Sequence, residues 1–397
     1  MKKPAPLAGR IPDRDAVRIV DIINLSSSAD TLLRERVLSL RAKGVDNHIL
    51  CIDGSCVPAL RAAGIPVGTV HLPRGANPFM LVWALAEMVV YLRRVKPDLV
   101  HTHCSVPGIV GRLAARIAGV PVVMHTVHGF HFHEGSTPLA RAFGVAVEKF
   151  VGRFTHVLLS QNRDDIEQAI RYDIVPRERL HYIGNGIALE EFPLTRRTAT
   201  SGRAPVITCV ARFEPVKNHT LLLAAARELA QRGAAFELRL VGGGEGRAGA
   251  EALCAEWGLS DHVRFLGYRD DIAALLADSD IAVLTSRKEG IPRAALEAMA
   301  VGLPVVATRV IGTREVVRDG DTGVLVELDD AGALADALVR LMSDPALRTS
   351  MGTRGREVVE AEFDEAQVVT RLERMYRDSL VRRGIRVPAA LAHEVKA

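Results

Sequence analysis

Residues 289–304 of the chain read EGIPRAALEAMAVGLP, and they lie between two apolar segments, 281–284 and 305–307, that are typical of buried strands. Pro292 suits the first turn of a helix, where its missing N–H costs nothing. The residues after it are mostly good helix formers, and Gly302 can end the helix. The stretch therefore predicts strand, loop, helix and strand in that order, as in a parallel α/β sheet.

Two carboxylates flank the start of this predicted helix. Glu289 lies on the loop before the helix, and Glu297 lies inside it. A helix N-terminus presents free amides and a partial positive charge, which together favour an anion. The stretch can therefore hold a phosphate while the two carboxylates bind the hydroxyl groups of a polyol. The ordinary alternative is a capped surface helix without a ligand.

The residue order in this stretch resembles the donor-sugar signature of the family 4 retaining glycosyltransferases. The match consists of Glu-Gly-Ile-Pro, four further residues, and then Glu-Ala-x-Ala-x-Gly-x-Pro-Val-Val. The resemblance implies that Glu289, with the backbone of Gly290 and Ile291, contacts the sugar and that Glu297 contacts the ribose. It also implies the two-domain fold called GT-B, which usually works without a metal, and no cofactor besides the nucleotide-sugar substrate.

The rest of the chain alternates twice between strand-like and helix-like segments. Strands are predicted at 17–25, 48–52, 67–71, 99–103, 121–127 and 156–160, and then at 206–211, 237–241, 263–266, 281–284, 305–307 and 323–326. The helices that we predict include 30–43, 78–95, 107–118, 139–151 and 364–383.

This alternation predicts an α/β protein with two doubly wound, parallel-sheet (Rossmann-like) domains. Ligands of such sheets bind beyond the carboxyl ends of the strands, so we expect the site in a cleft where the two domains face each other. The resemblance implies an acceptor-binding first domain, a donor-binding second domain and a C-terminal helix that crosses back to the first. The predicted divisions are a flexible lead 1–16, domains 17–189 and 206–363 around a linker 190–205, and the crossing helix and tail 364–397.

Two cations follow the first strand of the second half, at Arg212 and Lys217, and Lys217 is predicted to begin the next helix. Positive charge there can stabilise a diphosphate as it leaves the sugar. The ordinary alternative is a pair of solvated surface cations, but the position resembles the diphosphate-binding pair of the family. The glycine-rich turn with Gly243 and Gly244 follows the next strand, and in the family this turn lies beside the nucleotide. A later turn keeps the acidic residue of the family at Glu315.

Histidines gather at two strand ends of the first half. The string TVHGFHF at residues 126–132, with His128 and His131, resembles the family branch that extends lipid-linked glycans in capsule and exopolysaccharide assembly. The resemblance implies a place near sugar and acceptor for His128, with His131 as a lesser candidate. His125 and His128 point to opposite faces of an extended strand, which disfavours a metal site. Polar packing is the expected role of His125 and of the neighbouring His101 and His103.

The acceptor is predicted from two further segments. Where the family has a Gly-Gly turn after the first strand, this chain has Ser26–Ser28, whose amides and hydroxyls can contact an acceptor phosphate. Residues 79–83 read FMLVW and are either a membrane-facing surface that meets a polyprenyl-linked glycan or a helix buried on the sheet. The apolar run 79–92 is too short to span a bilayer, which takes about 20 apolar residues.

Composition sets outer limits on function. A net charge of +4 over 397 residues does not indicate a nucleic-acid-binding protein, which would carry a concentrated basic face. The five cysteines are irregularly spaced, which favours free thiols in a reducing cytoplasm. The N-terminus has no apolar core of a signal peptide, so we expect a cytoplasmic protein with peripheral contact to the inner face of the membrane.

These observations predict a retaining glycosyltransferase of cell-surface polysaccharide synthesis. It would move a hexose or N-acetylhexosamine from a nucleotide diphosphate, favoured to be uridine-linked, to a glycan or lipid-linked acceptor. The residues assigned to catalysis are His128, Arg212, Lys217 and Glu289. The alternatives are a non-catalytic nucleotide-sugar-binding subunit, and a sugar-nucleotide epimerase or phosphorylase of the same fold.

Overall fold

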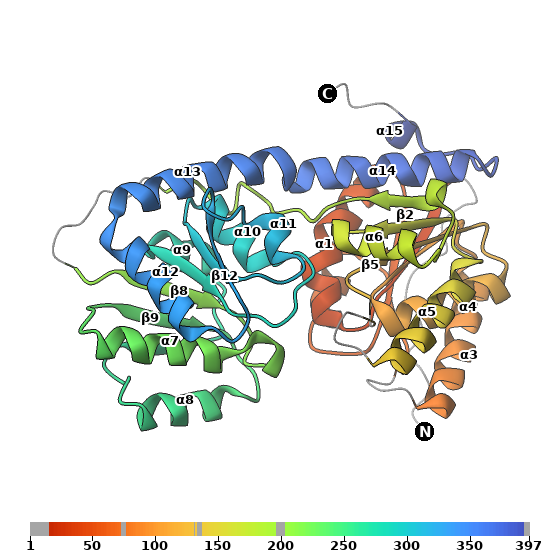
Figure 1. Ribbon diagram of the computed structural model, residues 1–397. Helices are drawn as coiled ribbons and strands as arrows, with labels where there is room; N and C mark the ends of the chain where they lie inside the picture. The colour runs from red at the N-terminus through yellow and green to blue at the C-terminus, as the bar shows by residue number, and fades with distance from the viewer. Residues whose placement is uncertain (1–15, 73–76, 131, 133–136, 196–202, 393–397) are drawn as a thin grey trace. The chain divides into compact units, whose positions relative to one another are not determined.

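The computed structural model describes residues 16–72, 77–130, 132, 137–195 and 203–392. The chain divides into two compact units (Figure 1). Unit 1 comprises Met1–Ile183 and Val369–Ala397, and unit 2 comprises Gly184–Val368. Unit 1 is therefore built from both ends of the chain, and unit 2 from the segment between them.

Unit 1 contains a seven-stranded, fully parallel sheet in the order β3-β2-β1-β4-β5-β6-β7. Its strands are β1 Arg18–Ile22, β2 Asp46–Cys51, β3 Val67–Thr69, β4 Leu99–His103, β5 Val122–Val127, β6 Val157–Ser160 and β7 Leu180–Tyr182. Its helices are α1 Ser26–Ala42, α2 Val57–Ala62, α3 Pro78–Val95, α4 Ser105–Ala118, α5 Pro138–Gly152, α6 Arg163–Arg171, the 3-10 turn η1 Arg177–Arg179, and α15 Ala389–Ala392.

Both faces of this sheet are covered because side chains along each strand alternate between two apolar cores. Val20, Ile22 and Leu50 belong to the core under α3 and α4. Ile49 and Cys51 belong to the core under α1 and α2. The doubly wound arrangement predicted from the sequence is thus present in unit 1.

Unit 2 contains a six-stranded parallel sheet in the order β10-β9-β8-β11-β12-β13. Its strands are β8 Val206–Val210, β9 Glu237–Val241, β10 Val263–Gly267, β11 Ile281–Leu284, β12 Val305–Thr308 and β13 Gly323–Val326. Its helices are the 3-10 turn η2 Pro215–Lys217, α7 His219–Gln231, α8 Arg247–Glu256, α9 Ile272–Ala277, α10 Arg293–Ala300, α11 Thr313–Val316, α12 Ala331–Ser343 and α13 Pro345–Glu362. Along β11, Ile281 and Val283 face one core, while Ala282 and Leu284 face the other.

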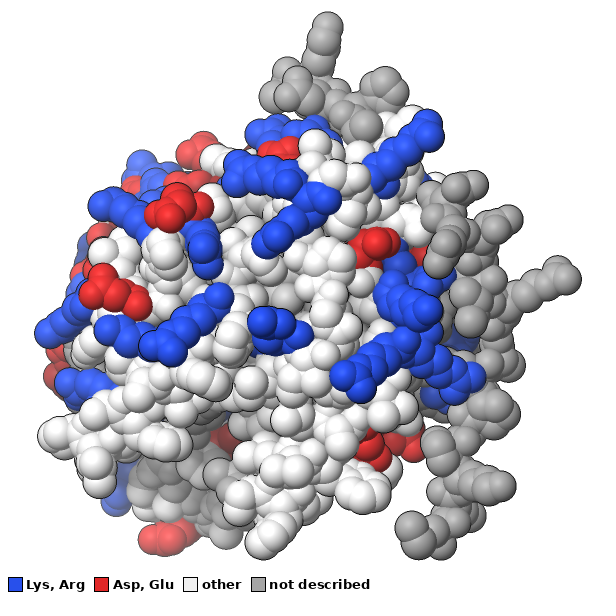
Figure 2. All heavy atoms as spheres, turned by 90° about the vertical axis from the view of Figure 1, so that its right-hand side faces the viewer, with Lys and Arg blue, Asp and Glu red and all other residues white. Residues whose placement is uncertain are grey.

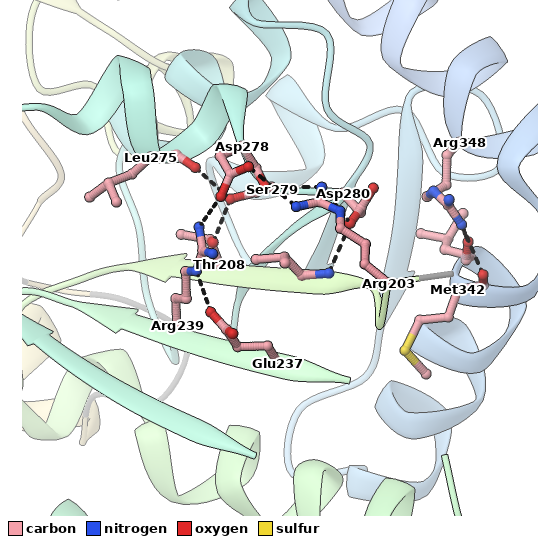
Figure 3. A network of polar contacts seen from close by, with 12 residues as sticks. Arg203, Thr208, Glu237, Arg239, Leu275, Asp278, Ser279, Asp280, Met342 and Arg348 are labelled. Carbon is pink, nitrogen blue, oxygen red and sulfur yellow. Dashed lines mark hydrogen bonds and ion pairs between the residues drawn. The ribbon is translucent and has the colours of Figure 1, made fainter. Parts of the chain in front are cut away.

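A network of ion pairs ties strands of unit 2 together near the N-terminal edge of its sheet (Figure 3). Arg239 of β9 contacts Glu237 at 2.5 Å and Asp278 at 2.8 Å. Arg203 contacts Asp278 and Asp280, which lie just before β11. Partly exposed pairs of this kind contribute little stability each. The polar residues that the sequence singled out lie at the opposite, carboxyl edge.

The helix α14 Glu365–Val381 carries the chain from unit 2 into unit 1, whose second segment begins at Val369. Within unit 1, the buried Tyr376 places its hydroxyl 2.6 Å from Nδ1 of His101. Lys43, the residue after α1, lies 2.6 Å from Glu373. The prediction that the last helix packs on the first domain is therefore confirmed.

Three local predictions were wrong. α1 begins at Ser26, so Ser26–Ser28 form its first turn instead of an open loop. Lys217 ends the 3-10 turn η2, and α7 begins only at His219 because Asn218 adopts a left-handed conformation with φ of 51°. Pro292 is the residue before α10, not a residue of its first turn.

The structure divides the chain between Ile183 and Gly184, ahead of the expected linker 190–205. Ile187 and Phe192 are buried in the core around α10 and α13, so the chain already packs on unit 2 there. Residues 196–202 of the expected linker and the lead 1–15 lie outside the described residues. None of the described helices combines the length and the apolar character needed to cross a membrane.

Candidate functional site

Two loops of unit 2 meet at the carboxyl ends of the neighbouring strands β8 and β11. The hydroxyl of Thr285 donates hydrogen bonds to the carbonyls of Lys217 and Asn218, each at 3.1 Å. The backbone N–H of Arg287 donates to the carbonyl of Val216 at 2.8 Å. These three bonds fix the loop that carries Lys217 against the loop that carries Glu289.

The side chains of Lys217 and Glu289 are in direct contact. Nζ of Lys217 lies 2.6 Å from Oε1 of Glu289, and the hydroxyl of Ser286 donates to the same oxygen at 2.5 Å. The Lys217 side chain is 22% exposed and that of Glu289 10%, so the pair is largely withdrawn from water. A cation and a carboxylate held at this edge can bind a phosphate and a sugar hydroxyl side by side.

Gly290 is held by a third loop, which follows β12. A Cβ atom on Gly312 would lie 1.3 Å from the carbonyl oxygen of Gly290, and Gly312 has a φ of +85°. Only glycine fits such a close approach in this conformation. The chain has Ile311 and Gly312 where the family has two glycines, and the second of these positions is the one that touches Gly290.

Glu297 lies in the second turn of α10, a short helix whose residues 295–300 are all buried. Burial raises the pKa of Glu297, while Arg293 opposes the shift through a hydrogen bond of 3.0 Å from its Nε to Oε1 of Glu297. A largely buried carboxylate at this position favours a ligand that donates hydrogen bonds, such as the hydroxyls of a ribose.

Arg212 and the glycine turn are neighbours beyond β8 and β9. The N–H of Phe213 donates to the carbonyl of Gly243 at 2.8 Å. A Cβ atom on Gly244 would lie 2.8 Å from the carbonyl oxygen of Phe213, so the two turns are in backbone contact. Arg212 is 69% exposed and pairs with Glu214 at 2.9 Å, which leaves its guanidinium open to a ligand.

The structure thus places Lys217, Glu289 and Gly290 in one contact network, with Glu297 one helix turn further on. Arg212, Gly243 and Gly244 line the same carboxyl edge of the sheet, beyond β8 and β9. Sequence reasoning missed Ser286 and Thr285, which support Glu289 and the Lys217 loop. The only signal was their position at the end of β11, where polar residues follow an apolar strand.

In unit 1, His128 follows the carboxyl end of β5 and is linked to a buried acid. Its Nε2 lies 3.4 Å from Nδ1 of His103, and Nε2 of His103 lies 3.0 Å from Oδ1 of Asp21. The pKa of His128 is lowered to about 3, chiefly by burial and also by the neighbouring His103, while a hydrogen bond with Gln161 opposes the shift. His128 is therefore a neutral imidazole with a fixed orientation. His131 lies outside the described residues.

Asp21, His101 and His103 bring potential metal ligands within 4.8 Å of one another. Their surroundings do not suit a cation, because the guanidinium of Arg36 contacts the carboxylate of Asp21. Both nitrogens of His101 are also engaged, by the Tyr376 hydroxyl at 2.6 Å and by the Thr126 hydroxyl at 2.7 Å. The His101 ring is therefore fully paired, whereas Oδ2 of Asp21 and Nε of Arg36 are buried without a hydrogen-bond partner.

The sheet face decides which histidines meet. His103 and His128 approach each other on the side of Asp21, whereas His125 bonds the Thr102 hydroxyl at 2.9 Å and lies against Gly108 of α4. His125 and His128 therefore do not converge, as their spacing along the strand predicts.

Two family models match the chain: "Glycosyl transferase 4-like domain" over residues 30–186 and "Glycosyl transferases group 1" over residues 193–358. The UDP-Gal:alpha-D-GlcNAc-diphosphoundecaprenol alpha-1,3-galactosyltransferase of Escherichia coli is 31% identical over 309 residues, which cover 75% of this chain and 80% of that protein. The putative glycosyltransferase EpsD of Bacillus subtilis is 30% identical over 291 residues, covering 70% of this chain and 76% of that protein.

Solved structures share the fold at lower identity. Anabaena Alr3699/HepE in complex with UDP-glucose superimposes with a TM-score of 0.77 at 21% identity, covering 91% of this chain and 99% of that chain. Sucrose-phosphate synthase from Thermosynechococcus elongatus gives 0.78 at 23% identity, covering 92% and 100%. At these identities the likeness establishes the arrangement of helices and strands in two parallel-sheet domains.

Proposed function

We propose, from the premise that this chain belongs to the group 1 glycosyl transferases (family 4, GT-B type), that it moves a sugar from a uridine diphosphate donor to a glycan acceptor. The observation that carries the proposal is the contact between Lys217 and Glu289 at the carboxyl edge of unit 2. Transfer of a hexose or N-acetylhexosamine needs a cation at the departing phosphate and an acceptor of hydrogen bonds at the sugar, and this pair supplies both. The name of the Escherichia coli relative supports uridine as the base.

The diphosphate is assigned to Lys217 and Arg212. Negative charge grows on the phosphate as its bond to the sugar breaks, and fixed positive charge lowers the energy of that state. Lys217 is partly withdrawn from water, where such an interaction is stronger than in bulk solvent. The backbone of Gly243 has open space around its Cβ position for the phosphates, while Gly244 packs against Phe213 beside Arg212. Glu297 receives the ribose hydroxyls.

The sugar is assigned to Glu289 and to the backbone of Gly290 and Ile291. Oε1 of Glu289 already accepts from Lys217 and Ser286, so this carboxylate suits binding of hydroxyls better than attack on the sugar. Retention of configuration then follows from a displacement on one face of the sugar. The bond from the anomeric carbon to the phosphate breaks, the bond to the acceptor oxygen forms, and the acceptor proton passes to a phosphate oxygen.

His128 is assigned to the reacting sugar and the acceptor. The carboxylate of Asp21 accepts from Nε2–H of His103, which leaves Nδ1 of His103 to accept from Nε2–H of His128. This order fixes the tautomer of His128 at neutral pH. A neutral imidazole orients a hydroxyl without adding charge to the site.

The acceptor is assigned to a polyprenyl-linked glycan at the inner face of the cell membrane, with the enzyme in the cytoplasm. The printed name of the Escherichia coli relative includes a diphosphoundecaprenol acceptor. A role in cell-surface polysaccharide synthesis is the proposed setting.

The test incubates the purified chain with a panel of UDP-sugars and a short-chain prenyl diphosphate N-acetylglucosamine. We expect UDP release that depends on the acceptor, and a product whose anomeric proton coupling matches that of the donor. A product with inverted coupling would refute retention. A non-catalytic subunit would release no UDP, and an epimerase would change the donor sugar while the diphosphate stays attached.

A further inference from the structure

Large apolar side chains are concentrated on one part of unit 1. Of the sixteen exposed large hydrophobic side chains in the described part of the chain, nine lie on the consecutive helices α3, α4 and α5. The most exposed of these nine are Phe79 at 86%, Leu139 at 83% and Phe143 at 71%. Apolar side chains scattered singly over a surface need no explanation, but a cluster of this size marks an interaction surface.

The exposed side chains form a stripe along each of two helices. On α3, Phe79, Val82, Trp83 and Val90 follow one another at helical spacing on the outward face. The inward face of α3 is also apolar, because Ala84, Met88 and Leu92 are buried in the core. A helix that is apolar on two faces is expected to be covered on both, and the described residues of unit 1 cover only one face of α3.

The second stripe lies on α5, where Leu139, Phe143 and Phe150 are exposed. α4 packs against both α3 and α5, so the two stripes belong to one side of the sheet. We call the outward sides of α3 and α5 together the two-helix face.

The exposed charged side chains of these helices are basic, and one partly exposed acid, Glu87, lies beside Trp83. The last turns carry Arg93 and Arg94 on α3 and Lys149 on α5, all exposed. The only acids in α3, α4 and α5 are Glu87, which accepts from His71 and Trp83, and Glu148, which is buried against Arg112.

Figure 2 looks onto this side of unit 1, where basic side chains lie above a region in which white side chains predominate. Apolar side chains bordered by lysine and arginine match the interface of an anionic bilayer, which takes up apolar groups and attracts cations.

The position of the stripes relates them to the sugar-transfer site. In a parallel sheet, a crossover helix begins at the carboxyl edge of the strands. The first turns of α3 and α5, with Phe79 and Leu139, therefore start at the edge where His128 follows β5. A lipid-linked acceptor has its prenyl chain in the bilayer and its sugar outside, so an apolar surface at this edge suits it.

We propose that the two-helix face docks unit 1 on an anionic lipid bilayer. The choice of a membrane in preference to a protein partner rests in part on the proposed lipid-linked acceptor. Lipid binding itself does not depend on sugar transfer, so the two proposals can fail separately.

The experiment is co-sedimentation of the full chain with vesicles of phosphatidylcholine that contain about a third phosphatidylglycerol, against vesicles of phosphatidylcholine alone. The test variant is Phe79→Ser with Leu139→Ser, and the matched control is Ile170→Ser with Val381→Ser, which also removes two exposed apolar side chains of unit 1. We expect the test variant to lower the partition coefficient about ten-fold or more, because two deeply inserting side chains are lost. The control should bind like the unaltered chain.

A third variant, Arg93→Gln with Arg94→Gln, should reduce the preference for anionic vesicles without abolishing binding. Circular dichroism and the unfolding midpoint confirm that each variant is folded. Equal partition of the test variant and the control would overturn the proposal, and so would self-association through this face without vesicle binding. If vesicle binding fails while UDP is still released with the short-chain acceptor, the proposed function stands without the docking surface.

Discussion

Lys217 is the residue whose charge the proposed reaction needs most. Lys217→Ala removes the cation from the departing diphosphate and leaves the largely buried Glu289 without its partner. We expect the free-energy barrier of transfer to rise by about 2–4 kcal/mol, which lowers the rate constant, with a smaller change in donor affinity. Steady-state kinetics with a saturating UDP-sugar measures this.

The matched control is Arg232→Ala, which removes an exposed cation that follows α7 and pairs with Asp336 and Glu228. This change should leave turnover as it is. Lys217→Ala with Glu289→Ala should cost less than the sum of the two single changes, because the residues share one contact. Full turnover in Lys217→Ala would remove this residue from the mechanism.

Gly312 is the residue of the site where an added side chain is tolerated least. Gly312→Ala places a Cβ atom 1.3 Å from the carbonyl oxygen of Gly290 at a φ of +85°, so the loop that holds Gly290 has to move. We expect weaker UDP-sugar binding, measured by calorimetry, and a lower unfolding midpoint.

Gly249→Ala is the control for this change, since Gly249 lies inside α8 and has open space around its Cα. It should stabilise the protein by about 0.5–1 kcal/mol through helix propensity. Equal binding by both variants would contradict the close packing of the Gly312 loop.

At the residue scale, the sequence predicted Glu289, Glu297, Arg212 and Lys217 because each belongs to a recognisable local pattern. It predicted that these four residues converge on one pocket, but it did not predict the direct ion pair between Lys217 and Glu289, which lie 72 positions apart along the chain. It also could not assign a role to Ser286, because that role depends on a hydrogen bond to Glu289 that forms only in the folded loop.

The crossing helix α14 illustrates how one element depends on one polar contact. Tyr376 is buried, and its hydroxyl is paired with Nδ1 of His101. Tyr376→Phe leaves that nitrogen buried without a partner, which costs about 1–3 kcal/mol. We expect the free energy of unfolding from urea titration to fall by this amount.

Tyr268→Phe is the control, because Tyr268 is 85% exposed and its hydroxyl can be replaced by water contacts. It should leave the free energy of unfolding unchanged. If both variants lose the same free energy of unfolding, the hydrogen bond between α14 and the sheet of unit 1 makes no net contribution to stability.

At the element scale, most strands and helices could be predicted because apolar periodicity sets them. The bounds of α3, β4, β9, β11 and β13 agree with the prediction to the residue. One strand, β7, was not predicted, and β1 ends at Ile22 where the prediction ran to residue 25. Other errors fall at helix starts, where short polar residues serve equally well as loop and as first turn. Ser26–Ser28 are of that kind, and only the packing of α1 on the sheet decides between the two.

For the whole molecule, the buried histidines of unit 1 predict a loss of stability in mild acid. Burial lowers the pKa of His128 to about 3 and also lowers the pKa of His101, His103 and His125. In the unfolded chain these groups titrate near their ordinary value of about 6.5, so the unfolded state binds more protons as the pH falls below it.

The stability that these neutral imidazoles supply is therefore complete above about pH 6.5 and is lost as the pH falls toward the folded pKa values. His128 alone should account for about 1 kcal/mol between pH 7.5 and pH 5.5. Urea unfolding at both pH values measures the loss, and His128→Asn should lose about 1 kcal/mol less than the unaltered chain. Identical losses in both would mean that His128 is already accessible to protons.

A second whole-molecule prediction uses the two tryptophans, Trp83 in unit 1 and Trp257 in unit 2. Trp257 packs partly buried beside the core of unit 2, so in Trp83→Phe the remaining fluorescence reports the unfolding of that unit. UDP at 100 times its dissociation constant should stabilise unit 2 by about 2.7 kcal/mol, because a ligand that binds only the folded state shifts the equilibrium by mass action.

The same titration with Lys217→Ala added to Trp83→Phe should need a higher UDP concentration for the same shift, since the diphosphate has lost a cation. Uridine, which has no phosphate, should stabilise both variants equally and far less than UDP. If UDP does not shift the unfolding transition that Trp257 fluorescence reports in Trp83→Phe, the donor does not bind at the carboxyl edge of this sheet. Lys217, Glu289 and Glu297 would then need another explanation for their position there.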